Sequence, residues 1–242
     1  MKNKVILLTA CINPDGMSFT YLQDPKEREK QYLSALQWYL LNTQYQIVLC
    51  ENTNYCLPTT FDKYINLKRL EYLSFNGNKN FDKHKGKGIG EANIIEYALE
   101  NSNFINDDTL IVKITGRLII KNVNQLISLM SNNKAVYGWR VRHEKAGMQC
   151  ASHFFSAPKI FFKHYFLSSK SIIDDSKFIY FETVLYKEIL IWKNNSNVFN
   201  ELYLPILVIG KSGSNGDSYK IERMPYLKTF VRFLAHKTPW YK

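Results

Sequence analysis

Two short segments of the chain combine glycines with basic side chains, a composition typical of sites that bind phosphate. In the segment 85–91, Lys-Gly-Lys-Gly-Ile-Gly-Glu, the glycines allow backbone amides to turn toward one point, and a helix is expected to follow directly. The segment lacks the Lys-Ser/Thr pair of a Walker A sequence, and it does not directly follow a strand, as a dinucleotide fingerprint would. A phosphate site and a surface loop that precedes a helix therefore explain this segment equally well.

The second segment is Thr115-Gly116-Arg117, which comes directly after the apolar run 110–114. That run predicts a buried strand, so the three residues should lie at the carboxyl end of the strand. Arginine presents planar donors that bind phosphate or carboxylate through two hydrogen bonds, and the neighbouring glycine leaves room for a ligand. An anion site is favoured here over an ordinary strand end with an exposed arginine.

Two further segments carry one candidate each. Glu182 begins a helix expected over 181–192. A carboxylate in the first turn either complements the helix dipole or faces a cleft as a general base, and the residues alone favour the dipole. Lys211 belongs to the Gly/Ser loop 210–216, which suits closure over a diphosphate and fits a plain connection equally well.

The elements that must position these residues alternate between strand and helix. Apolar runs predict strands at 4–10, 46–50, 69–74, 109–114 and 135–139, and helical spacing predicts helices at 26–41, 91–100, 123–130 and 181–192. Repeated strand-helix units predict an α/β fold with a mainly parallel, twisted sheet flanked by helices on both faces. Such sheets bind ligands at the carboxyl ends of their strands, which here are 9–13, 51–54 and 115–117.

Length and composition predict one folded domain. The chain has 242 residues, of which 45% are hydrophobic, and four cysteines that form no CxxC pair, so a structural zinc site is not expected. The sequence has no apolar run of the roughly 18 residues that a membrane span needs. The short apolar run after Lys4 predicts a first strand and not a signal peptide, so a cytoplasmic location is expected.

The formal net charge of +11 favours an anionic partner: nucleic acid, an anionic membrane surface or a phosphorylated substrate. The basic residues are scattered and no RRM, KH or helix-turn-helix signature occurs, so nucleic acid is not the expected partner. The tail 221–242 is basic, and apolar residues follow a helical stripe beside two cations (Leu227, Phe230, Val231 and Leu234, with Lys228 and Arg232). The tail is predicted either to dock peripherally on the inner face of the cell membrane or to pack on the domain.

Four blocks in the first half of the chain resemble the small bacterial GT-A-type glycosyltransferases that build capsule, O-antigen or lipooligosaccharide. The blocks are 7–14, 47–52, 86–92 and 113–117, in the order expected of that family. The resemblance implies a GT-A-like catalytic domain over 1–220, with a nucleotide-binding half at about 1–135 and an acceptor half at about 136–220. It implies transfer of a sugar from a nucleotide-sugar to a hydroxyl of a glycan or lipid-linked glycan acceptor.

The same resemblance assigns roles to residues. The loop after the first strand, the acid after the second, the glycine-rich turn and the strand end hold the donor in that family. Glu182 takes the place of the base that deprotonates the acceptor in inverting enzymes, with Asp174 and Asp175 as substitutes; a retaining mechanism would need no such base. The positions implied to bind the nucleotide-sugar are Thr9, Ala10, Glu51, Lys87, Gly88, Glu91, Lys113, Thr115, Gly116 and Lys211.

The chain departs from the family where a metal would be held. Thr115-Gly116-Arg117 stands in place of the Asp-x-Asp motif, and Asp107-Asp108 precedes the strand at its other end. No metal site and no cofactor other than the donor substrate is therefore expected, and Arg117 and Lys113 are implied to neutralise the leaving diphosphate. Two alternatives stay open: a non-catalytic, membrane-associated partner in glycan assembly, and a basic protein that binds nucleic acid or transfers nucleotidyl groups.

Overall fold

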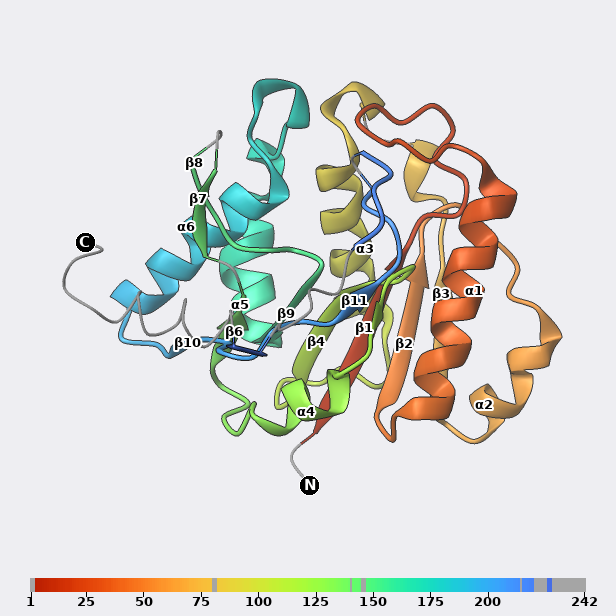
Figure 1. Cartoon of the computed structure of the whole chain (residues 1–242), viewed down its shortest axis with the longest axis horizontal. Helices are drawn as coiled ribbons and strands as arrows, with labels where there is room; N and C mark the ends of the chain where they lie inside the picture. The colour runs from red at the N-terminus through yellow and green to blue at the C-terminus, as the bar shows by residue number, and fades with distance from the viewer. Residues whose placement is uncertain are drawn as a thin grey trace.

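A computed structural model describes residues 3–79, 82–139, 141–144, 147–213, 215–219 and 226–227. Within these residues seven strands form one sheet in the order β10-β6-β9-β4-β1-β2-β3 (Figure 1). The strands β4, β1, β2 and β3 are parallel, β9 runs antiparallel to both of its neighbours, and β10 is parallel to β6. The expected α/β fold with a mainly parallel central sheet is confirmed.

The strands are β1 (Lys4–Ala10), β2 (Gln46–Glu51), β3 (Leu70–Ser74), β4 (Leu110–Thr115), β5 (Ile119–Ile120), β6 (Val136–Gly138), β7 (Arg142–Glu144), β8 (Gly147–Gln149), β9 (Phe154–Pro158), β10 (Phe199–Glu201) and β11 (Val208–Ile209). The α-helices are α1 (Pro25–Asn42), α2 (Asp62–Asn66), α3 (Lys87–Asn101), α4 (Val123–Ser128), α5 (Lys159–Phe161) and α6 (Phe181–Asn194). A π-helical turn, Phe162–Phe166, and a 3-10 turn, Leu167–Ile172, continue α5.

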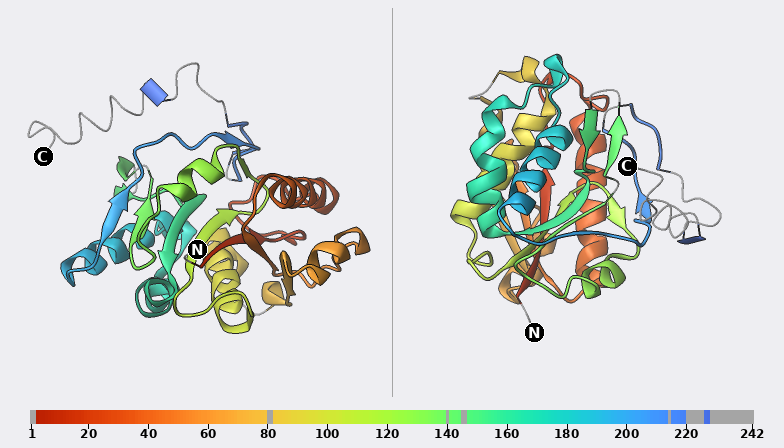
Figure 2. Two further views of the ribbon diagram at one scale, coloured as in Figure 1. Left: turned by 90° about the horizontal axis from the view of Figure 1, so that it is seen from below. Right: turned by 90° about the vertical axis from the view of Figure 1, so that its left-hand side faces the viewer.

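Helices cover both faces of the sheet, as Figure 2 shows in its view along the sheet. Alternate side chains of β1 enter two separate cores, since Ile6 and Leu8 point to one face and Val5 and Leu7 to the other. The first core is closed by α1 and α4, and the second by α3, α5 and α6. Because both faces are covered, the strands read in the sequence as unbroken apolar runs.

Helix α3 begins at Lys87, four residues before the predicted start, so the expectation of a loop up to Gly90 was wrong. Glycines disfavour a helix interior, which is why the sequence indicated a loop. Here close packing requires one of them: a Cβ on Gly88 would lie 2.9 Å from Cγ2 of Ile173. The turn itself is made by Gly86, whose φ of 87° lies in the left-handed region.

Two loops extend beyond the carboxyl edge of the central strands. One is the connection 11–24 between β1 and α1, which a backbone hydrogen bond from Tyr21 to the carbonyl of Gly213 joins to the second loop. The second loop, 210–219, follows β11, and β11 pairs antiparallel with β5 just after the end of β4. This pairing carries the second loop back over the strand ends.

The remaining predictions concern the tail and the membrane. Apart from residues 226 and 227, the tail 221–242 lies outside the described residues, so its predicted stripe stays a prediction. No helix within the described part of the chain is long and apolar enough to cross a membrane.

Candidate functional site

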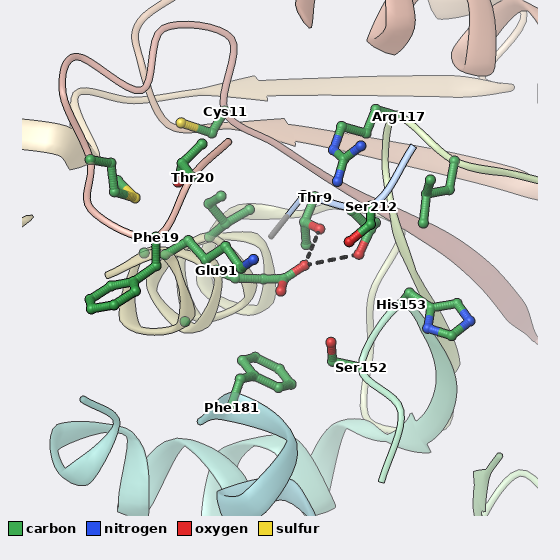
Figure 3. Close-up of a pocket in the computed structure, with 18 of the residues that line it drawn as sticks. Thr9, Cys11, Phe19, Thr20, Glu91, Arg117, Ser152, His153, Phe181 and Ser212 are labelled. Carbon is green, nitrogen blue, oxygen red and sulfur yellow. Dashed lines mark hydrogen bonds between the residues drawn. The ribbon is translucent and has the colours of Figure 1, made fainter. Parts of the chain in front are cut away.

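A cavity of about 540 Å³ opens at the carboxyl edge of the sheet, above the ends of β1 and β4 (Figure 3). Its walls come from the loop after β1, the start of α3, the end of β4, the segment 149–153 that leads into β9, the start of α6 and the loop 210–219. Segments from both halves of the chain therefore meet at one site, as expected for ligands of a parallel sheet.

Lys113, a predicted donor-binding residue, lies beneath the residues that line the cavity and is not itself part of the lining. Its side chain is fully buried, and its Nζ pairs with Oε1 of Glu91 at 2.5 Å and donates to the carbonyl oxygen of Ser152 at 2.8 Å. Oε1 of Glu91 also accepts a hydrogen bond from the hydroxyl of Thr9 at 2.9 Å (Figure 3). Burial raises the pKa of Glu91, but the Lys113 ammonium, the Thr9 hydroxyl and the Lys87 charge together outweigh burial and hold that pKa below its ordinary value. Lys113 of β4 and Glu91 of α3 thus form an ion pair that joins the two elements beneath the cavity.

Two of the basic residues that line the cavity lie close together. Lys87 is the first residue of α3, and Arg117 follows β4. A Cβ on Gly213 would lie 2.6 Å from Nη2 of Arg117 and 3.7 Å from Nζ of Lys87, so one loop residue covers both. Burial lowers the pKa of Lys87, while the carboxylates of Glu182 and Asp175 oppose that shift. Two cations at the start of a helix form a site suited to an anion.

Two carboxylates face the same cavity. Oε1 of Glu182, in the first turn of α6, accepts a hydrogen bond from the hydroxyl of Ser152 at 2.5 Å. Asp175 is 5% exposed, and its Oδ2 accepts from the amide of Gly88 at 3.3 Å. Burial raises the pKa of Asp175 to about 6, although the Gly88 amide acts in the opposite direction. A carboxylate of this kind can exchange a proton near neutral pH.

The structure brings most of the predicted residues together in the cavity wall. Both catalytic candidates, Glu182 and Arg117, line it, and so does Asp175, one of the substitute bases. Asp174 is turned toward its own loop, where it accepts from Ser176 and pairs with Lys177. The predicted donor-binding residues that line the cavity are Thr9, Ala10, Lys87, Gly88, Glu91 and Thr115.

Lys113 and three further predicted residues lie behind the wall or at its margin. A Cβ on Gly116 would lie 2.7 Å from the carbonyl oxygen of Thr9, so only glycine fits where β4 leaves the sheet. Glu51 is fully buried behind the cavity lining. Lys211 is exposed. Its backbone carbonyl oxygen accepts a hydrogen bond from Arg117, so the backbone of Lys211 contacts the site and its side chain does not line it.

Glu51 organises the loops around the strand ends. Its carboxylate accepts from the amides of Ile12, Thr53 and Tyr55 at 3.1, 2.8 and 3.0 Å, and from the hydroxyl of Ser74 at 3.3 Å. With its oxygens occupied in this way, Glu51 supports the shape of this side of the cavity from behind. Asn52, which is 1% exposed, lines the cavity beside it.

Sequence reasoning included Asn52 in the strand-end range 51–54 without singling it out, and it missed Ser152 and Arg28; all three residues line the cavity. Arg28 is 6% exposed and donates to the carbonyl oxygens of Cys11 at 2.7 Å and Leu22 at 3.1 Å. It therefore holds the loop after β1 from the side of α1. The position of Asn52 directly after β2 was a signal for that residue, whereas nothing in the local sequence marked Ser152.

Asp107 and Asp108 lie in the turn before β4, at the opposite edge of the sheet from the cavity. Thr115-Gly116-Arg117 presents no carboxylate at the end of β4. In the part of the chain that the structure describes, no three His, Cys, Asp or Glu side chains are grouped so that they could hold a metal ion.

No protein-family model and no curated protein matches the chain. Among solved structures, it is similar to a protein from Desulfovibrio desulfuricans G20 assigned as a nucleotide-diphospho-sugar transferase, with a TM-score of 0.43 and 11% identity over 84% of this chain and 80% of that chain. It is also similar to a 4-diphosphocytidyl-2C-methyl-D-erythritol synthase, with a TM-score of 0.42 and 8% identity over 98% and 99% of the two chains. At these identities, neither protein assigns a role to any side chain of the cavity.

Proposed function

We propose that the protein is a glycosyltransferase that moves a sugar from a nucleotide-sugar donor to a hydroxyl of a second substrate. The observation that carries the proposal is that two cations and two carboxylates line the same cavity. The cations are Lys87 and Arg117, and the carboxylates are those of Asp175 and Glu182. A sugar transferase needs both: stabilisation of a leaving phosphate and a base for the attacking hydroxyl.

The donor would lie along the strand ends. Its nucleoside would occupy the side formed by Thr9, Ala10 and Asn52, and its diphosphate would lie against Arg117 and Lys87. The negative charge that develops when the sugar leaves would be balanced by these two side chains. In this proposal the cations take the role that a divalent ion has in many phosphate-transfer sites, and turnover proceeds without metal.

Glu182 would act as the general base of an inverting reaction. Its carboxylate accepts the proton of the acceptor hydroxyl while the oxygen attacks the anomeric carbon, and the bond from that carbon to the nucleotide phosphate breaks. The proton ends on Glu182 and the electron pair of the broken bond ends on the phosphate. Its place in the first turn of α6, with one oxygen held by Ser152, supports this role.

Nucleotidyl transfer is the second candidate, since it also uses a nucleotide and a basic site. In that reaction the acceptor is itself a phosphate in many cases, and it would have to approach Glu182 and Asp175, which repel it. A hydroxyl acceptor meets no such repulsion. A non-catalytic partner in glycan assembly would keep the cavity but would not turn over the donor.

We further propose that the acceptor is a bacterial surface glycan, free or lipid-linked, and that the protein works in the cytoplasm at the inner face of the membrane. The resemblance of the four sequence blocks supports the glycan. The apolar stripe and cations predicted for the tail 221–242 support the membrane surface.

A thermal-shift screen against UDP, GDP, CMP and dTDP sugars tests the proposal first. A donor present at one hundred times its dissociation constant should add about 2.7 kcal/mol to the free energy of unfolding. Arg117→Ala should abolish most of that gain, since it removes a cation from the diphosphate site. The absence of any shift across the panel would contradict the proposal.

A further inference from the structure

Ser152 is a buried hydroxyl that none of the sequence patterns singled out. It is 8% exposed and precedes β9 in the wall of the cavity. Its hydroxyl donates to Oε1 of Glu182 at 2.5 Å, and its carbonyl oxygen accepts from Nζ of Lys113 at 2.8 Å. Figure 3 shows the side chain directed into the cavity.

The backbone of Ser152 is held by Lys113, a contact that does not involve the side chain of Glu182. Lys113 holds the Ser152 carbonyl, and Lys113 is itself held by its pair with Glu91 at 2.5 Å. Glu91 is bonded in turn to Thr9 on β1. These contacts tie the backbone of Ser152 to the central sheet. Only one side-chain torsion, χ1, then sets the position of its hydroxyl relative to Glu182.

Glu182 has several torsions and a competing attraction. Burial lowers the pKa of Lys87, and of the neighbouring charges that raise it again the carboxylate of Glu182 has the largest effect. Without the hydroxyl of Ser152, the carboxylate would be drawn toward Lys87. Such a movement would remove the base from the acceptor and would place a negative charge where the diphosphate is to bind.

We propose that Ser152 is the positioning residue of Glu182. It holds Oε1, keeps the carboxylate apart from Lys87 and leaves Oε2 to receive the proton of the acceptor hydroxyl. The inference rests on the proposed function for the role of Glu182, but the restraint itself is a property of the free protein.

The kinetic test compares Ser152→Ala, Ser152→Thr, Glu182→Gln and the double variant Ser152→Ala/Glu182→Gln in sugar transfer. Ser152→Ala should lower kcat by about 10- to 100-fold, the range that a displaced catalytic group produces. Ser152→Thr, which keeps the hydroxyl, should recover most of the lost rate. The double variant should be no slower than Glu182→Gln, because a residue that acts only through Glu182 has no effect once the carboxylate is gone.

Ser156→Ala is the matched control, since Ser156 is a fully buried serine of β9 whose hydroxyl contacts Sδ of Met130. It should leave kcat unchanged. Should Ser152→Ala fail to fold, Ser152→Cys keeps the volume with a weak donor and should show the same loss. Wild-type kcat in a folded Ser152 variant, or losses that multiply in the double variant, would overturn the inference.

A crystal structure of Ser152→Ala gives an answer that does not need turnover. The carboxylate of Glu182 should be displaced toward Lys87, and an unmoved carboxylate would overturn the inference even if the wild type is active. If instead the wild type transfers no sugar while the displacement is seen, the proposed function fails and the restraint on Glu182 stands.

Discussion

Asp175→Asn should stabilise the protein at pH 8 and change its stability little at pH 4. Burial raises the pKa of Asp175 to about 6 from its ordinary value of 3.8. The ionised carboxylate is therefore disfavoured in the folded state, and the stability that the protonated group retains at low pH is lost as the pH rises from about 4 through 6. Above pH 6 the carboxylate is ionised in both the folded and the unfolded state, and the full loss of stability is reached.

The magnitude follows from the size of the shift. A difference of roughly 2 pKa units corresponds to about 3 kcal/mol in the free energy of unfolding. Asparagine keeps a carbonyl oxygen that can accept from the Gly88 amide at the present 3.3 Å, but it loses the attraction to Lys87. We therefore expect a gain of about 1 to 3 kcal/mol at pH 8, which falls below about 1 kcal/mol at pH 4.

Urea denaturation of wild type and variant at both pH values measures this difference. Asp174→Asn is the matched control, because hydrogen bonds from Ser176 hold the pKa of Asp174 below its ordinary value. That control should lose stability at pH 8, the opposite sign to its neighbour, and the loss should still be seen at pH 4, because it fades only as the pH falls below 3.8 and through the lowered pKa of Asp174. A variant Asp175→Asn that is less stable than wild type at pH 8 would contradict this reasoning, because it would show that the ionised carboxylate of Asp175 stabilises the folded protein.

Three further predictions concern the site and the tail. Arg117→Ala should slow sugar transfer by about 2 to 4 kcal/mol in activation free energy, as measured by kcat/KM, and transfer should persist in EDTA; complete loss in EDTA with recovery in manganese would contradict this. Gly88→Val should weaken nucleotide affinity in calorimetry, because the added side chain would clash with Ile173. Unchanged affinity would show that the start of α3 does not contribute to nucleotide binding. Deleting the residues after Arg223 should reduce sedimentation with anionic liposomes but leave donor hydrolysis intact, because each lost cation near the surface removes about 1 kcal/mol of attraction; aggregation of the truncated protein would show that the tail packs on the domain.

The sheet could be predicted from the sequence because its central strands are buried on both faces. The run 4–10 coincides with β1, and the runs near 46, 70 and 110 each match a strand to within a residue. The antiparallel strand β9 was not predicted, because Phe154 and Phe155 continue in the chain into further aromatic residues and no turn separates them from a helical pattern. Strand direction within a sheet is a tertiary property that a local pattern does not carry.

The site could be predicted in part. Residues at or just beyond the carboxyl ends of strands, such as Thr9 and Arg117, could be predicted because parallel strands bring these ends to one edge of the sheet. Glu51 also lies at the carboxyl end of a strand, but its carboxylate accepts hydrogen bonds from backbone amides of the neighbouring loops and does not line the cavity. Ser152 became visible only through its contact with Glu182, thirty residues away in the chain, and no single-sequence pattern records such a pairing.

The most direct test of sugar transfer is to identify what leaves the donor. Wild-type protein, incubated in EDTA with the nucleotide-sugar that gives the largest thermal shift and a glycan acceptor, should release the nucleoside diphosphate, or the monophosphate in the case of a CMP sugar, together with a glycosylated acceptor. Glu182→Gln should retain donor binding and lose this release. Absence of release from every bound donor, together with release of pyrophosphate from a nucleoside triphosphate, would contradict the proposal and identify nucleotidyl transfer instead.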